Sequence, residues 1–346
     1  MTNEQEIFNY AMQSQGGIYI PSGRLEIDTV LESMLEVITE HIKVTNELNK
    51  HLPNVNIFYT NNMSINACAF KINNQYFISI NVGAVIRLKE IFDNIVLNNI
   101  ITEKIFNNQD VLINSSELLY FAMIFLIAHE HSHIRFGHCD LINHLFWDKE
   151  TKFLMEATSN CLANDGLFRQ TLEYDADCCA IANLINRQLM SRDYHNRDFN
   201  EFSHGVSLCT LACYILFKIF DNGEHINYDN YDLDNLENST HPQPGLRMNY
   251  IVVNILSILS QYYKDNEINA ILDKIWEYIL IFERINNKEL KSDNLCITIG
   301  NTRKGSEHIR RVHNNWENVR KMLLPFSHDK LADFIEDTGW NKKIID

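Results

Sequence analysis

The chain has 346 residues, a length that suits about two average domains or one large one. Hydrophobic residues make up 45% of the sequence, which excludes a largely disordered chain. The formal net charge is −15, from 30 Lys and Arg against 45 Asp and Glu. Nucleic acids and anionic membrane surfaces repel a chain of that charge, so we expect it to bind neither.

The cysteines and the apolar runs indicate where the protein works. The eight cysteines contain no CxxC pair, which predicts free thiols in a reducing compartment rather than a disulfide framework. The N-terminus lacks the basic and apolar regions of a secretory signal. The longest apolar runs, 118–128 and 205–217, are shorter than the ~18–20 residues of a membrane span. We therefore expect a soluble cytoplasmic protein with no integral membrane segment.

The first elements in the chain are one helix and a small sheet. Apolar residues recur at helical spacing over 25–50, which predicts an amphipathic helix. Short β-branched and aromatic segments, separated by Asn-rich turns, predict strands over 54–60, 65–72 and 75–82.

The rest of the chain is predicted to be helical, which makes the fold class α+β and mainly α-helical. Asn114 and Glu117 have the spacing of a capping box, so a helix is expected to begin there and to end at Gly137. Its apolar residues leave no polar face, which predicts burial on all sides. The further helices are expected over 167–190, 203–220, 245–262 and 267–285.

The motif that carries chemistry lies at the end of the buried helix. His129, Glu130 and His133 form the pattern H-E-x-x-H. Residues four apart on a helix share one face, so His129 and His133 can bind the same metal ion. Glu130 is turned about 100° away, where it can take a proton from a metal-bound water. The pattern predicts one Zn²⁺ per chain.

A catalytic zinc commonly has three protein ligands, and the third comes from another segment. His131 and His138 would lie on other faces of a continuous helix and are excluded. The longer pattern HExxHxxGxxH is absent. The remaining candidates are Glu173 and Asp177, which also lie four apart on a predicted helix. We expect Glu173 to bind the metal and Asp177 to hydrogen-bond a ligand histidine, with the exchanged assignment as the alternative.

Four segments together resemble a known family. HEHSHIRFGH (129–138), EYDAD (173–177), THPQPGLR (240–247) and NACAF (66–70) follow the motif order of gluzincin metallopeptidases of the HtpX and CAAX-prenyl-endopeptidase type. The resemblance covers about residues 54–255. It implies a zincin-like fold with a small sheet over the HExxH helix, and Glu173 as the third zinc ligand.

The resemblance also implies roles for residues around the metal. His241 is expected to stabilise the oxyanion, although a His-Pro pair is also typical of a helix start. Arg247 is expected to bind either Asp177 or the substrate. A strand edge in this family can pair with an extended substrate, which assigns substrate binding to four residues: Asn66, Ala67, Cys68 and Ala69.

The expected function is a zinc-dependent endopeptidase acting on a protein substrate. Its domains are predicted as an N-terminal helical region (1–53), a catalytic domain (54–261) and a C-terminal helical region (262–346). The membrane hairpins of the family are missing, which favours a soluble branch such as the Lit-like phage-exclusion peptidases. The alternatives are a catalytically degenerate zincin-fold binding or regulatory protein and a delivered protease effector.

Two charged segments remain outside these motifs. Residues 221–239 hold six acidic residues and no Lys or Arg, which predicts a mobile loop. Residues 303–321 hold six Lys or Arg and two Glu, a local net charge of +4. The second segment is a solvated helix face or a surface for an acidic partner.

Overall fold

The computed structural model of the chain describes residues 12–13, 15–21, 23–49, 51–72, 74–106, 111–145, 153–155, 166–196, 198–221, 226–288 and 291–333. The chain divides into two compact units. The first comprises residues 1–157 and 323–331, and the second comprises residues 158–322 and 332–346. The described part is mostly helical with one small sheet, as the sequence predicts. The predicted domain boundaries at residues 53 and 261 stay a prediction.

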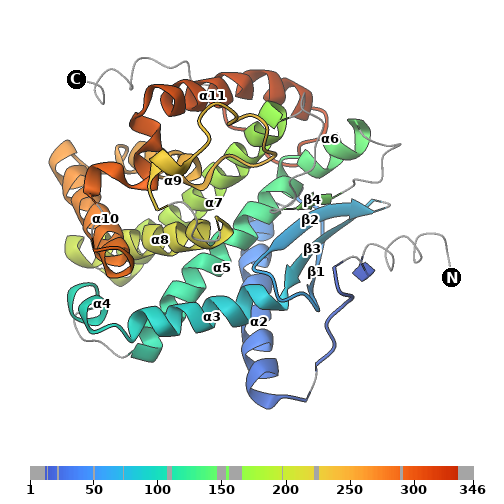
Figure 1. Cartoon of the computed structure of the whole chain (residues 1–346). Coiled ribbons are helices and arrows are strands. Elements are labelled where there is room, and N and C mark those ends of the chain that lie inside the picture. The colour runs from blue at the N-terminus through green and yellow to red at the C-terminus, as the bar shows by residue number, and fades with distance from the viewer. Residues whose placement is uncertain are drawn as a thin grey trace. The chain divides into compact units, whose positions relative to one another are not determined.

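The first unit contains the sheet, in the order β1-β3-β2-β4 (Figure 1). Its strands are β1 (Val55–Thr60), β2 (Ala67–Ile72), β3 (Gln75–Asn81) and β4 (Phe153–Met155). β1 runs parallel to β3, whereas β2 is antiparallel to both of its neighbours. Three aromatic rings pack together in this sheet, with Phe70 and Phe77 stacked at 5.2 Å and Phe58 edge-on to both. The sequence predicts the first three strands correctly, because their β-branched and aromatic residues fit a packed pleated surface.

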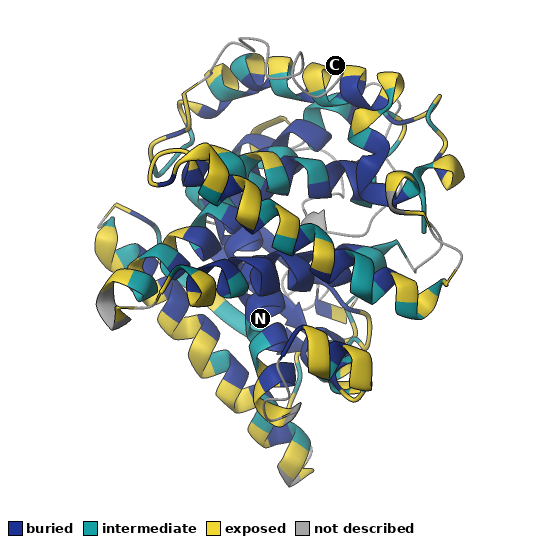
Figure 2. Ribbon diagram, turned by 90° about the vertical axis from the view of Figure 1, so that its left-hand side faces the viewer, coloured by how far each residue is buried: buried dark blue, intermediate teal, exposed yellow. Residues whose placement is uncertain are grey.

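The first unit contains one helix that is buried over most of its length, α5 (Val111–Arg135), among its other helices. The others are α2 (Leu25–Leu48), α3 (Val82–Val96), α4 (Asn99–Lys104) and α6 (His138–Leu145). α5 packs against α2, α3 and β2, and every residue from 121 to 134 is buried. Helices such as α2 and α10 (Asp265–Asn286) alternate between exposed and buried residues, as Figure 2 shows for the surface helices.

The predicted start of α5 is wrong by about one turn. The helix begins at Val111, so Asn114 lies inside it and is buried rather than capping its end. The predicted end is confirmed, because Gly137 has a φ of +75° just after Arg135. A left-handed residue of this kind interrupts the helical path, and glycine adopts it without a side-chain clash.

The second unit is built from helices packed on one another. They are α7 (Gly166–His195), α8 (Phe199–Phe220), α9 (Pro244–Leu259), α10 (Asp265–Asn286) and α11 (Arg303–Leu323), with the short 3-10 helices η1 (Tyr228–Asn230), η2 (Ser292–Asn294) and η3 (Cys296–Asn301). α9 packs against α7, α8 and η3, and α8 packs against α10. Pro244 is the first residue of α9, which confirms the helix start expected from the His-Pro-x-Pro sequence.

Two helices, α5 and α8, are long and apolar enough to cross a membrane, which the shorter apolar runs in the sequence do not suggest. In the most apolar 18-residue stretch of each helix, 72% of the residues are buried in α5 and 83% in α8. Such burial is typical of the core helix of a folded domain.

Candidate metal centre

The HExxH residues lie near the C-terminal end of α5. His129, Glu130 and His133 are each 1% exposed, and they follow an apolar stretch that fixes this part of the helix in the core. Burying three titratable side chains is costly unless they are paired or bind a metal. Their position therefore indicates a function beyond packing.

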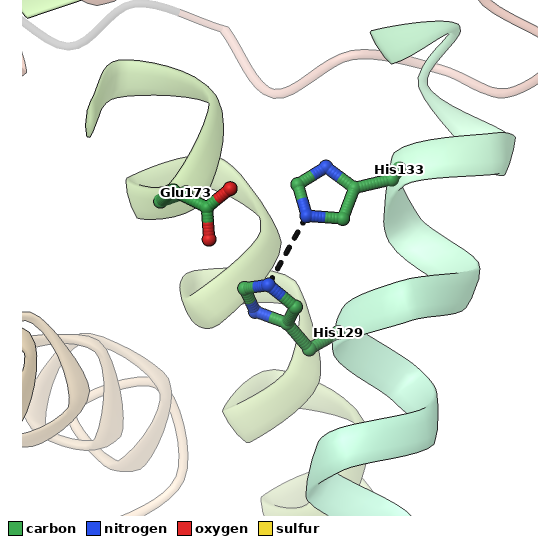
Figure 3. Close-up of side chains that lie close together, drawn as sticks. All are labelled: His129, His133 and Glu173. Atoms are coloured by element: carbon green, nitrogen blue, oxygen red, sulfur yellow. Dashed lines mark hydrogen bonds between the residues drawn. The ribbon is translucent and has the colours of Figure 1, made fainter. Parts of the chain in front are cut away.

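The two histidines face each other with their Nε2 atoms 3.1 Å apart. Two nitrogens bound to one tetrahedral Zn²⁺ at ~2.0–2.1 Å would be about 3.3–3.4 Å apart. The spacing of four residues on α5 thus brings both atoms close to the separation that zinc requires. The dashed line in Figure 3 marks this contact.

His138, which the sequence analysis excludes as a ligand, contacts one of the two expected ligands. Its Nδ1 lies 2.9 Å from Nδ1 of His133, and the side chain is fully buried. If His133 donates this hydrogen bond, its Nε2 keeps a lone pair for a metal. On one continuous helix His138 would lie on another face, but Gly137 turns the chain and His138 begins α6.

Glu130 is held by the sheet. The backbone N–H of Ala69 on β2 donates a hydrogen bond to Glu130 Oε2 at 2.6 Å. This bond occupies one carboxylate oxygen and fixes the direction of the side chain. The small sheet therefore contacts the HExxH helix at the residue that is expected to act as the base.

The predicted substrate-binding strand is not a free edge. β4 pairs with β2 at Cys68, Ala69 and Phe70. Asn66 and Ala67 precede this pairing, and all four of the predicted residues are buried. Binding of a substrate at Asn66, Ala67, Cys68 and Ala69 stays a prediction, and at Cys68 and Ala69 it would require β4 to leave.

Glu173 and Asp177 lie on one face of α7, as predicted, and both are buried. Arg247 on α9 donates from Nε and Nη2 to the two carboxylate oxygens of Asp177, at 2.8 and 2.7 Å. Arg247 thus has the first of its two expected roles, binding Asp177. With both oxygens of Asp177 engaged by a cation, Glu173 is the better placed of the two as a metal ligand.

His241 lies beside the same carboxylate. Its Nε2 is 3.4 Å from Glu173 Oε2, and its Nδ1 is 2.9 Å from the hydroxyl of Thr240. A hydroxyl that donates to Nδ1 leaves the proton of the neutral ring on Nε2, facing Glu173. The structure brings His241 to the site, as the resemblance implies.

His129, His133 and Glu173 form a buried group that could hold a metal ion (Figure 3). One ligand atom from each lies within 4.8 Å of the others. Two imidazoles and one carboxylate are a donor set of catalytic zinc sites, so the residues fit the predicted ion. Among the residues that the structure describes, no other group of this kind occurs, and His131 and Asp177 are not part of it.

Two thiols next to these motifs have raised pKa values. Burial raises the pKa of the Cys139 thiol, and it likewise raises the pKa of the Cys178 thiol. A buried, protonated thiol is a poor nucleophile. Neither thiol is therefore a good candidate for a nucleophile at this site.

The acidic and basic segments are partners of each other. Lys304 on α11 pairs with Asp234, and Arg311 pairs with Glu237 at 2.5 Å. The acidic segment, which the sequence predicts as a mobile loop, is thus bonded to α11 at Asp234 and Glu237. Because these opposite charges meet within the chain, part of the predicted basic surface at 303–321 is neutralised internally.

No protein-family model, curated protein or solved structure matches this chain.

Proposed function

We propose that this protein is a zinc-dependent endopeptidase with a zincin-like catalytic fold. The observation that carries the proposal is the buried group of His129, His133 and Glu173, with Glu130 next to the first ligand. The motif order that resembles gluzincins supports the same reaction class. The negative net charge and the free cysteines support a cytoplasmic enzyme that acts on a protein substrate.

The residues around the site have distinct roles in this proposal. When bound, zinc supplies Lewis acidity, which polarises a peptide carbonyl and acidifies water. Glu130 takes the proton of the attacking water and later returns it to the leaving amine. The Ala69 N–H holds one oxygen of Glu130 at 2.6 Å and keeps the carboxylate oriented for both transfers. His241 donates from Nε2 toward the developing oxyanion of the scissile carbonyl.

The test compares wild type with Glu130→Gln. The glutamine amide oxygen can still accept from the Ala69 N–H, so the variant is expected to keep its fold and its zinc. It lacks a base, so cleavage of fluorescein-labelled casein is expected to fall by at least about 100-fold. New peptide N-termini in cells that express wild type, but not in cells that express the variant, would identify the substrate.

Glu117→Gln is the matched control, because it makes the same change on α5 about 20 Å away along the helix. It is expected to leave cleavage and zinc content unchanged. Metal analysis of purified wild type should find about one zinc per chain, and its absence after reconstitution would overturn the proposal. Bound zinc with no cleavage by either wild type or Glu130→Gln would instead favour the alternative of a degenerate binding or regulatory protein.

A further inference from the structure

Gln170 lies one helical turn before Glu173 on α7 and is fully buried. Residues three apart on a helix are neighbours on its surface, so the two side chains leave α7 on the same side. We propose that Gln170 is a positioning residue that holds His241 beside Glu173. The inference rests on the proposed function, in which His241 stabilises the oxyanion.

The hydrogen bonds of Gln170 fix its orientation. Its Nε2 donates to the backbone carbonyls of Leu236 and Ser239, at 2.8 and 2.7 Å. Its Oε1 accepts from Nε2 of His308 at 2.7 Å. Carbonyl oxygens only accept, so the amide group must face them, and the carboxamide oxygen must face the histidine. Gln170 thereby uses both of its N–H groups to hold the backbone that leads to His241.

The segment after Ser239 carries this restraint to the site. The backbone N–H of His241 donates to Ser239 Oγ at 3.3 Å, and its ring contacts the Thr240 hydroxyl. The other ring nitrogen lies 3.4 Å from Glu173. A continuous chain of contacts thus begins at Gln170 and returns to the same helix at Glu173.

The support of Gln170 comes from α11. His308 is 4% exposed, and burial lowers its pKa. A neutral imidazole has one N–H, and the contact at 2.7 Å directs it to Gln170. Glu237 lies 4.0 Å from the other nitrogen of His308 and is held by Arg311.

Gln170 acts locally, because other bonds hold the remainder of the acidic segment. Gly245 N–H donates to the hydroxyl of Tyr231 at 3.1 Å, and Lys304 binds Asp234. Both contacts remain when Gln170 is replaced. Its loss should therefore release residues 236–241 without unfolding the second unit.

The first experiment replaces Gln170 with methionine, which keeps the length of the side chain and removes its hydrogen bonds. We expect kcat on labelled casein to fall about 10- to 100-fold with little change in KM, because a displacement of about 1 Å at a reacting group has an effect of that size. Zinc content should not change. Gln188→Met is the matched control, since Gln188 is also a buried glutamine on α7, and it should leave kcat unchanged.

The second experiment measures hydrogen exchange and needs no substrate. Amides of 236–241 should exchange faster in Gln170→Met, while those of α8 should not change. His308→Phe keeps a ring and removes the donor to Gln170, so it should cause the same change if the first variant does not fold. Unchanged exchange at 236–241 in a folded variant would overturn the inference.

The third experiment separates positioning from general stability. In a His241→Ala background, Gln170→Met should cause no further loss of kcat, because it acts only through His241. A further loss as large as in wild type would overturn the inference. If wild type cleaves no protein, the proposed function fails, but faster exchange at 236–241 would still support the contact between Gln170 and this segment.

Discussion

Arg247 and Asp177 form a buried bidentate ion pair, with exposed fractions of 3% and 0%. The guanidinium also lies over the ring of Phe217, 4.4 Å from its centroid. The pair joins α9 to α7 one turn after Glu173. It thereby fixes the helix face that carries the expected third metal ligand.

Replacing Arg247 with leucine should lower the free energy of unfolding by about 3–5 kcal/mol, because it leaves the Asp177 carboxylate buried without its cation. Urea denaturation measures the change. Arg303→Leu breaks an exposed pair with Glu307 and should leave the midpoint unchanged. Equal effects of the two substitutions would contradict a structural role for the buried pair. In the double variant with Asp177→Leu, much of the lost stability should return.

His138→Gln should weaken zinc binding by about 10- to 100-fold, because the ring no longer fixes the tautomer of His133. Competition with a zinc-sensitive dye gives the dissociation constant of each variant. His144→Gln changes an exposed histidine on the same short helix and serves as the control. Equal affinities in the two variants would show that His138 does not orient the ligand.

Gly137→Ala should destabilise the first unit by more than its backbone strain alone. An added Cβ would meet the backbone carbonyl carbon and oxygen of Phe326, both at 2.5 Å. Backbone atoms cannot rotate out of the way as the end of a side chain can. Gly17 has a similar φ of +80° and open space around it. Gly17→Ala should therefore cost only about 1 kcal/mol of strain. Thermal denaturation of both variants separates the two effects, and equal losses would contradict the contact with Phe326.

His204 should make the protein less stable in acid. Burial, with a smaller effect of Lys274, lowers the pKa of His204 from 6.5 to about 4. Between pH 6.5 and 4 the unfolded chain binds a proton that the folded protein excludes, so stability falls as the pH decreases through this range.

His204→Gln removes this dependence. Relative to wild type, the variant should gain about 1–2 kcal/mol in the free energy of unfolding between pH 7 and pH 4, a value that allows for partial contact of the ring with water. Denaturant titrations at several pH values measure the difference, with the exposed His51→Gln as control. A constant difference across the range would show that His204 does not titrate as its burial implies.

Several parts of the fold follow from local patterns. α2 and the first three strands lie where the sequence predicts them. The spacing of apolar residues along each segment matches the period of the helix or strand that it forms. α3 and α6 were missed. α3 directly continues β3 and α6 follows the turn at Gly137, and the patterns in the sequence predict no element over either segment.

Spacing along a helix predicts two pairs of residues at the candidate site, whereas His241 and Arg247 are implied by the family resemblance. The pitch of a helix places residues four apart on one face, which determines that His129 and His133 can share a metal, and that Glu173 and Asp177 can act together. No such rule applies between distant segments. That Arg247 binds Asp177 rather than the substrate was therefore one of two alternatives until the contact itself was seen.

The sequence by itself determined the His129–His133 pair, the buried helix that carries it and the excess of negative charge. Only the tertiary structure decided that β4 covers β2, that His138 contacts His133 and that the acidic segment binds α11. Helix and strand geometry determines which residues of one short segment share a face, and the residues of that segment are enough to predict it. Pairing between segments depends on which surfaces meet when the chain folds, and a pattern of residues along the chain does not record it.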